Sequence, residues 1–268
     1  MKKTVFIGGG NMAFAILGGL IHNDVPASTF RVVDPSTQAA NNLSALKVQC
    51  STGWPTDFDA HAVVLAVKPQ MMQAVLQERS EQLEGKLIIS IAAGVSVNQI
   101  KQWSQHSDAR VVRCMPNTPA LVSKGISGLY LTPNCTPEDW SLAYTLFQSC
   151  GEVLELQQEE QINAVTAISG SGPGYVFFLM EALAKAAQDM GFSENQANLL
   201  VNQTFLGAAT LAKQSDDSFS TLREKVTSKG GTTFAGLEAL RQLKVEESIV
   251  SAAKAALNRA IELQNQSN

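Results

Sequence analysis

The sequence predicts an α/β fold, in which a doubly wound parallel sheet is followed by an all-α C-terminal domain. Short and wholly apolar segments alternate with helical segments up to about residue 156, as is typical of parallel strands covered on both faces. From about residue 159 onward the helical patterns continue without a convincing strand. We therefore divide the chain into two domains, residues 1–158 and 159–268.

Six short segments are expected as strands, of which the first five are rich in aliphatic or β-branched residues. They are Val5–Ile7, Phe30–Val33, Val63–Val67, Leu87–Ile91, Val111–Met115 and Glu152–Leu156. A helix over Met12–Ile21 follows the first strand. Thr136 and Pro137 predict another helix start, with a cap, a proline at the first helical position and an acid soon after.

The second half predicts a series of helices. One covers Tyr175–Met190, and Ser193 with Gln196 forms a capping box for the next, which runs to about Gln214. A short helix, a glycine turn and two further helices complete the chain. The last helix places small and aliphatic residues on one stripe: Ile249, Ala252, Ala253, Ala256, Ala260 and Leu263. The helical half is rich in Ala and Gly and has few large side chains, which favours an intertwined homodimer over a self-sufficient monomer.

The composition excludes several classes of protein. Hydrophobic residues make up 45% of the 268 residues, which is typical of a globular chain. The net charge is -4 and the sequence has no basic run, which argues against nucleic acid as a partner. The four cysteines have no metal-ligand spacing, which predicts reduced thiols and no bound metal. Glycines interrupt the apolar N-terminus, and no segment is long and apolar enough for a membrane. We expect a cytoplasmic protein without a membrane partner.

A glycine motif follows the first strand and opens the first helix. The run Gly8, Gly9, Gly10, Asn11, Met12 and Ala13 fits G-x-G-x-x-A, and its place between strand and helix predicts a Rossmann-like dinucleotide site. Gly8 permits the tight turn, Gly10 admits the diphosphate and Ala13 allows close helix–strand packing. The alternative is a glycine turn that binds nothing.

Asp34 ends the second strand, roughly 20 residues beyond the motif, where an acid usually binds the ribose 2′-hydroxyl of NAD. Ser36 and Thr37 could instead donate to the extra phosphate of NADP, and Asp34 could simply cap the next helix. The residues alone leave the choice of cofactor open.

Three later strands end in unusual loops, which should face the nicotinamide because ligands sit beyond the carboxyl ends of parallel strands. Ordinary turn chemistry is the alternative for each. The loops are Ala66, Val67, Lys68 and Pro69; Ala92, Ala93 and Gly94; and Met115–Pro119, which contains Asn117.

Two glycine motifs in the helical half, Ser169–Gly174 and Ser228–Thr233, each lead into a helix. Hydroxyls and bare N–H groups at a helix N-terminus would suit a small carboxylate, although a close helix–helix contact is the alternative. The histidines, His22, His61 and His106, lie outside these motifs. Because an alcohol dehydrogenase normally needs a general base and a protonated imine does not, their placement favours an imine substrate.

Together these segments resemble the pyrroline-5-carboxylate reductase family over essentially the whole chain. The matching stretches are Phe6–Met12, Ala66–Pro69, Ala92–Val95, Met115–Pro119, Ser169–Pro173 and Val226–Thr233, of which the last is the most specific. The resemblance implies hydride transfer from NADPH, or from NADH, to 1-pyrroline-5-carboxylate, which gives L-proline in the last step of proline biosynthesis. It also implies interlocked dimers, sometimes within larger rings.

By the same implication, Gly8–Ala13 and Ala66–Pro69 hold the dinucleotide, and Thr233 hydrogen-bonds near the ring nitrogen of the substrate. The residues that would hold the substrate carboxylate are Ser228, Gly230, Gly231, Thr232 and Thr233. Lys229 departs from the proline of many members, and Asp34 from a neutral residue, which puts the common NADPH preference in doubt. Glu159 and Asp216 lie near positions that approach the site in relatives.

Two other functions are compatible with a Rossmann-like domain followed by helices. A β-hydroxyacid dehydrogenase would need a catalytic lysine early in the helical half, whereas Lys185 lies some three and a half turns beyond Gly172. A non-catalytic NAD-binding protein would show no turnover with any substrate. Assays with pyrroline-5-carboxylate and with 3-hydroxy acids separate the three.

Overall fold

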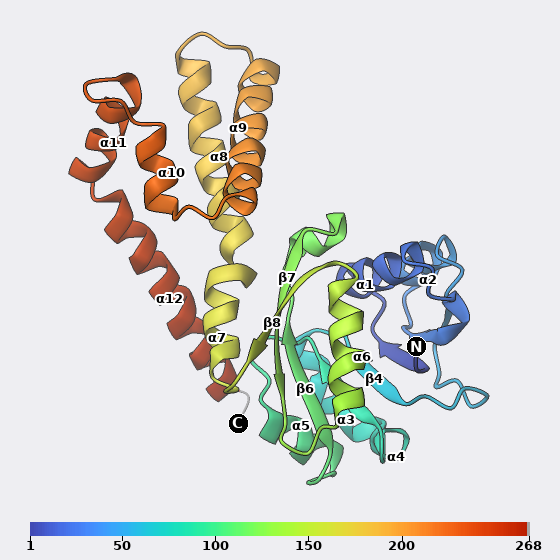
Figure 1. The fold of residues 1–268 in the computed structure, drawn as a ribbon. Helices are drawn as coiled ribbons and strands as arrows, with labels where there is room; N and C mark the ends of the chain where they lie inside the picture. The colour runs from blue at the N-terminus through green and yellow to red at the C-terminus, as the bar shows by residue number, and fades with distance from the viewer. Residues whose placement is uncertain (267–268) are drawn as a thin grey trace. The chain divides into compact units, whose positions relative to one another are not determined.

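The computed structural model describes residues 1–266 and contains an eight-stranded sheet (Figure 1). Its strands follow the order β3-β2-β1-β4-β5-β6-β7-β8. All neighbours pair in parallel except β6 and β7, so β7 and β8 run opposite to the rest. The bounds are β1 Thr4–Ile7, β2 Phe30–Val33, β3 Gln49–Ser51, β4 Ala62–Leu65, β5 Leu87–Ser90, β6 Arg110–Met115, β7 Gly125–Leu131 and β8 Gly151–Leu156.

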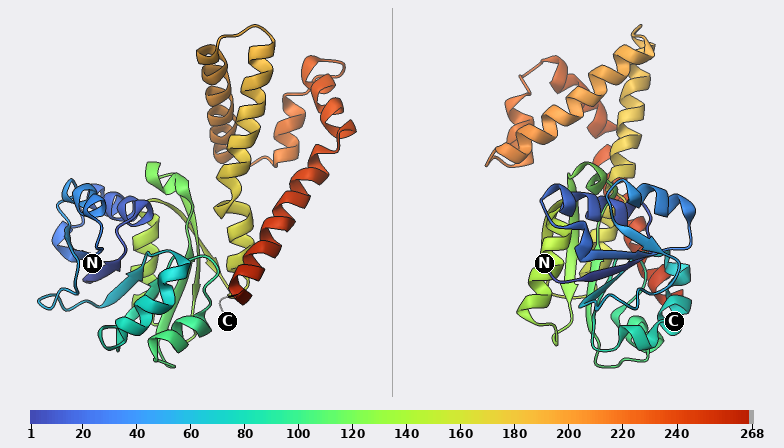
Figure 2. Two further views of the ribbon diagram at one scale, coloured as in Figure 1. Left: turned by 180° about the vertical axis from the view of Figure 1, so that it is seen from behind. Right: turned by 90° about the vertical axis from the view of Figure 1, so that its right-hand side faces the viewer.

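Helices lie on both sides of this sheet (Figure 2), which explains why its central strands are apolar throughout. Alternate side chains enter two apolar clusters: Phe6 and Ile89 belong to one, and Val5 and Ile88 to the other. The helices of the first part are α1 Asn11–His22, α2 Thr37–Ser44, α3 Met72–Glu78, α4 Ser80–Leu83, α5 Val97–Ser104 and α6 Pro137–Gln148, with short 3₁₀ turns η1 Ala27–Thr29, η2 Pro69–Met71 and η3 Thr118–Val122.

The remaining helices are α7 Gln161–Val165, the π-helical turn η4 Thr166–Gly170, α8 Gly172–Asp189, α9 Glu194–Gln214, α10 Phe219–Lys225, α11 Thr232–Gln242 and α12 Val245–Gln266. The helix start predicted at Thr136 and the capping box predicted at Ser193 are confirmed. Among the described residues, no helix is both long enough and apolar enough to span a membrane.

The predicted fold class is confirmed, with two strands that the sequence did not reveal. Strand β3 is polar and three residues long, and β7 contains two glycines and a serine among its apolar residues. The polar residues of β3 and the glycines of β7 interrupt the apolar pattern by which strands were predicted. The antiparallel direction of β7 and β8 is a further correction to a purely parallel sheet.

The motif Ser169–Gly174 leads into α8, as predicted, but its first residues lie in the π-helical turn that precedes this helix. Helix α7, the π-turn and α8 follow one another almost without a break, and the Ser171 N–H donates to the Thr166 carbonyl at 2.8 Å. An amide that bonds five residues back is already satisfied. The Ser171 N–H is therefore not free to bind an anion, contrary to the prediction of bare N–H groups here.

The chain packs as two compact units. Unit 1 contains residues 1–171 and the part of α12 from Ala256 onward, and unit 2 contains residues 172–255. The predicted boundary after residue 158 stays a prediction, because it marks a change of secondary structure and the units mark where the chain packs.

Candidate active site

The turn between β1 and α1 requires glycine at its first position. Gly8 has a φ of +100°, and a Cβ placed there would lie 2.6 Å from the Ala66 carbonyl oxygen. The Ala66 N–H in turn donates to the Ile7 carbonyl at 2.8 Å. The glycine turn therefore lies directly against the loop that follows β4, as the predicted dinucleotide site requires.

The N-terminus of α1 is open to an anion. Gly10 is the N-cap and has no side chain to satisfy the first helical N–H groups, and the first turn contains no acidic residue. A Cβ at Gly10 would meet nothing within 4 Å, whereas Ala13 is buried against the sheet. The first N–H groups of the helix, at Asn11, Met12 and Ala13, thus border free space, which fits a diphosphate.

The carboxylate of Asp34 is hydrogen-bonded to the glycine turn, a role that its sequence position did not reveal. One carboxylate oxygen accepts from the Gly9 N–H at 2.6 Å, and the other accepts from the Ser36 N–H at 2.8 Å. Ser36 then caps α2 by accepting from the Ala39 N–H. Asp34 is therefore satisfied within the chain, and whether it also meets a ribose stays a prediction.

The other predicted cofactor loops lie at the same edge of the sheet, because β1, β2, β4, β5 and β6 are parallel and the loops follow their carboxyl ends. Ala66 and Val67 are half-buried, while Lys68 is exposed and precedes Pro69 in a 3₁₀ turn. Gly94 has a φ of +72°. The structure thus gathers at one edge the predicted cofactor residues that follow these five strands.

Asn117 has a structural role that sequence reasoning missed. Its amide nitrogen donates to the Ser169 carbonyl at 3.1 Å, and its amide oxygen accepts from the Ile126 N–H at 2.9 Å. The side chain therefore links η3, β7 and η4. Its predicted contact with the cofactor stays a prediction.

A buried ion pair lies beneath the loop after β5. Arg113 is 1% exposed, and its Nη1 donates to Glu159 Oε1 at 2.7 Å. The same oxygen accepts from the Val97 N–H at 2.8 Å, at the start of α5. Burial lowers the pKa of Arg113, although the carboxylate of Glu159 opposes this shift. The sequence signal for this buried charge is the position of Arg113 within an otherwise apolar strand.

The predicted substrate loop lies in unit 2, before α11. Gly230 has a φ of +73°, and Gly231 is the N-cap without a side-chain cap. The Gly231 N–H donates to the Ser228 carbonyl at 3.0 Å, and the Ser228 hydroxyl lies beside Gly231. Thr232 and Thr233 are exposed in the first turn. The loop therefore presents hydroxyls and uncapped N–H groups, which suits a carboxylate.

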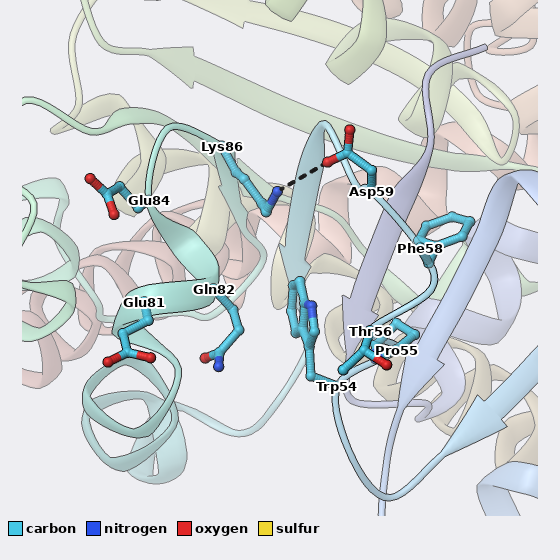
Figure 3. Close-up of a pocket in the computed structure, with 9 residues that line it drawn as sticks. All are labelled: Trp54, Pro55, Thr56, Phe58, Asp59, Glu81, Gln82, Glu84 and Lys86. Atoms are coloured by element: carbon cyan, nitrogen blue, oxygen red, sulfur yellow. Dashed lines mark ion pairs between the residues drawn. The ribbon is translucent and has the colours of Figure 1, made fainter.

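A hollow of about 470 Å³ in unit 1 contains none of the predicted site residues (Figure 3). It lies around α4 and the segments that precede β4 and β5, and its lining includes Trp54, Gln82 and Lys86. Lys86 Nζ lies 3.8 Å from a carboxylate oxygen of Asp59 and donates to the Ala60 carbonyl. The starts of β4 and β5 are at the opposite edge from the glycine turn, so this hollow is separate from the candidate site.

Comparison with known proteins identifies the family. Residues 159–263 match the family model described as pyrroline-5-carboxylate reductase dimerisation, and residues 3–94 match the model described as NADP oxidoreductase, coenzyme F420-dependent. The pyrroline-5-carboxylate reductase of Pasteurella multocida is 40% identical over 98% of this chain and 98% of its own length. The chain belongs to the pyrroline-5-carboxylate reductase family.

Further members of this family agree along the whole chain. The enzyme of Pseudomonas aeruginosa is 41% identical over 98% of this chain and 97% of its own length. A solved pyrroline-5-carboxylate reductase from Coxiella burnetii has a TM-score of 0.92 and 37% identity, with 98% of each chain covered. The reductase of Plasmodium falciparum, solved with NADP bound, has a TM-score of 0.87 and 28% identity, also with 98% coverage of each chain.

Proposed function

We propose that this chain reduces 1-pyrroline-5-carboxylate to L-proline with NAD(P)H, the last step of proline biosynthesis. The observation that carries the proposal is the pair of uncapped helix N-termini, at Gly10 and at Gly231, in a chain that matches family members over 98% of its length. The first suits a diphosphate and the second suits a small carboxylate. The alternative dehydrogenase and binding-protein functions have no comparable support.

In this proposal the cofactor lies along the carboxyl ends of the parallel strands. The residues that would hold it are Gly8, Gly9, Gly10, Asn11, Met12, Ala13, Asp34, Ser36, Ala66, Val67, Lys68, Pro69, Ala92, Ala93, Gly94 and Asn117. A Cβ placed on Gly10 would meet no atom within 4 Å. This free space beside the helix N-terminus supports the position of the diphosphate. A bound reduced nicotinamide would supply the hydride.

The loop before α11 would hold the substrate. Ser228 and Thr232 would contribute hydroxyls, and Gly230 and Thr232 N–H groups, for the carboxylate. Gly231 would shape the turn, since its own N–H donates to the Ser228 carbonyl. The ring nitrogen enters protonated, so its N–H donates to the Thr233 hydroxyl, which orients the C=N bond. The imine carbon accepts the hydride, its π electrons move to nitrogen, and the product is a secondary amine. The carbon that reacts needs no general base, because the proton is already on the ring nitrogen.

We assign both NADPH and NADH as usable cofactors, with NADPH as the family's common choice. The match to an NADP oxidoreductase model supports NADPH. The carboxylate of Asp34 at the end of β2 opposes it, because an acid there repels a 2′-phosphate. Ser36 and Thr37, at the start of α2, could donate to that phosphate.

We further propose a homodimer in the cytoplasm as the working form, from which any larger ring would be built. The matched dimerisation model and the exposed apolar helices of unit 2 support the dimer. All four cysteines are free thiols, which fits a reducing compartment.

The test is an assay of NAD(P)H oxidation by the purified protein. We expect turnover with pyrroline-5-carboxylate and formation of L-proline, measured with each cofactor. Absence of this turnover together with activity on a 3-hydroxy acid would support the dehydrogenase instead. Cofactor binding without turnover of any substrate would support the non-catalytic alternative.

A further inference from the structure

The last turns of α12 lie against the turn that follows β5, and both belong to unit 1. A Cβ placed on Gly94 would be 3.1 Å from the Leu263 Cβ. The side-chain oxygen of Gln264 accepts from Asn163 Nδ2 at 3.1 Å, and its backbone carbonyl accepts from Gln99 Nε2 at 3.4 Å. Three separate contacts therefore join the end of this helix to its surroundings.

The buried amide of Gln99 connects α12 to the start of α5. Gln99 is 2% exposed, and its Oε1 accepts from the Ser96 N–H at 2.7 Å to complete the capping box. Its Nε2 points the other way, to the Gln264 carbonyl. Carbonyls in the last turn of a helix have no partner within that helix, so this donor satisfies one of them. Movement of Gln264 would consequently disturb the cap of α5.

The segment between β5 and α5 is held at several points. Leu263 lies over Gly94, Glu159 accepts from the Val97 N–H, and Gln99 links Ser96 to α12. Gly94 adopts a φ of +72°, which disfavours residues with a Cβ. This segment includes Ala92–Gly94, the turn assigned above to the nicotinamide end of the cofactor.

We propose that Leu263 and Gln264 are positioning residues, which hold the Ala92–Gly94 turn in the conformation that binds the nicotinamide end of the cofactor. The inference rests on the proposed function for the nature of the ligand. It extends the cofactor site to the last helix of the chain, far from the glycine motif in sequence. The helix end acts through backbone position, without touching the cofactor.

The variant Gln264→Ala tests this role, because it removes the bond to Asn163 and loosens the helix end. Titration of NADPH, followed by quenching of tryptophan fluorescence, gives the Kd. We expect the Kd and the cofactor KM to rise about three- to tenfold, the range expected for one lost hydrogen bond. The KM for pyrroline-5-carboxylate should not change. Asn265→Ala, an exposed neighbour on α12, is the matched control.

Asn163→Ala tests the same bond from its other side. It should raise the Kd for NADPH by a similar factor. The double variant with Gln264→Ala should have a Kd no higher than that of either single variant, because both remove the same bond. Gln264→Glu keeps the acceptor oxygen and should restore the wild-type Kd. These variants also decide the question if Gln264→Ala does not fold.

Wild-type Kd values in both Gln264→Ala and Asn163→Ala would overturn the proposal. A lower melting temperature with an unchanged Kd would overturn it too, because the contact would then be structural only. If the wild-type protein binds NADPH but does not reduce pyrroline-5-carboxylate, the proposed function fails. The Kd comparison then still reads out the positioning role.

Discussion

The two compact units bury their apolar side chains very differently. In unit 1, every residue of β1, β4 and β5 is buried. In unit 2, helix α8 contains no buried residue, and Leu199 and Phe219 are 69% and 82% exposed. Exposed apolar surface of this extent marks an interaction site. Unit 1 is stabilised by its own core, whereas unit 2 needs a partner to cover it.

The largest effect is expected from charges on the exposed face of α9. Leu199 and Leu206 are 69% and 62% exposed and lie two turns apart on one side of the helix. The double variant Leu199→Asp with Leu206→Asp should raise the dimer dissociation constant at least about a thousandfold, since covering each of the four leucines in the dimer contributes at least roughly 1 kcal/mol. Sedimentation equilibrium at several protein concentrations gives the average mass, and from it the dimer dissociation constant.

The matched control for this comparison is Ala74→Asp, an exposed position on α3 of unit 1. It should leave the dimer intact. A dimer of unchanged affinity in the α9 double variant would show that this apolar face is not the interface.

Within unit 1, the next largest effect should come from a buried acid. Asp139 accepts two hydrogen bonds from Arg110 Nη1, at 2.8 and 2.7 Å, and its side chain is fully buried. Burial raises the pKa of Asp139, but bonds from the Thr136 backbone and from Arg110 outweigh this and lower it. Asp139→Asn should lower the free energy of unfolding by about 3 kcal/mol at neutral pH.

The pH dependence of that difference follows from the lowered pKa. The carboxylate stabilises the fold above its unfolded pKa, of about 4, and this contribution is lost as the pH falls through the lower folded value. Urea unfolding at several pH values should therefore show the variant and the wild type converging in acid. A constant difference at every pH would contradict the role of the charge.

Thr233→Ala tests the contribution of unit 2 to the chemistry. The hydroxyl lies exposed in the first turn of α11, and a hydrogen bond to a charged group contributes about 1.5–3 kcal/mol. We expect kcat/KM for pyrroline-5-carboxylate to fall about 10- to 100-fold, with the Kd for NADPH unchanged. Thr145→Ala, at an exposed position on α6 of unit 1, is the control. Equal loss of cofactor binding would contradict the assignment of this loop to the substrate.

The smallest effect concerns cofactor choice in unit 1. Asp34→Asn removes the charge but keeps one oxygen that can accept from the Gly9 N–H. The ratio of kcat/KM for NADPH to that for NADH should rise about fivefold, because roughly 1 kcal/mol of repulsion from the 2′-phosphate is lost. Asp24→Asn, at an exposed turn after α1, should leave the ratio unchanged. An unchanged ratio in Asp34→Asn would show that the carboxylate does not face the phosphate.

The same contrast explains which parts of the fold could be predicted. Phe30–Val33 was predicted with its observed bounds, because a short apolar run between polar loops specifies a buried strand. The polar edge strand β3 and the glycine-containing β7 have no such signal, and tertiary packing decides them. A helix start was predicted at Ser169–Gly174 and α8 begins there at Gly172, but the π-turn that satisfies the Ser171 N–H was not predicted.

The candidate site shows a similar division. Gly8 could be predicted, because the turn geometry needs a residue without a Cβ. The bond from Gly9 to Asp34 and the pairing of Arg113 with Glu159 could not, since they join residues 25 and 46 positions apart in the chain. Such pairs depend on strand order, which local patterns do not specify.

The most direct test of the account follows the hydride itself. The protein is incubated with pyrroline-5-carboxylate and NADPH that carries deuterium at both C4 positions of the nicotinamide, and the proline is analysed by mass spectrometry and NMR. Hydride transfer from the cofactor to the imine gives L-proline with one deuterium at C5, the former imine carbon. Proline without deuterium, or labelled only when the solvent is deuterated, would contradict hydride transfer from the cofactor to the imine.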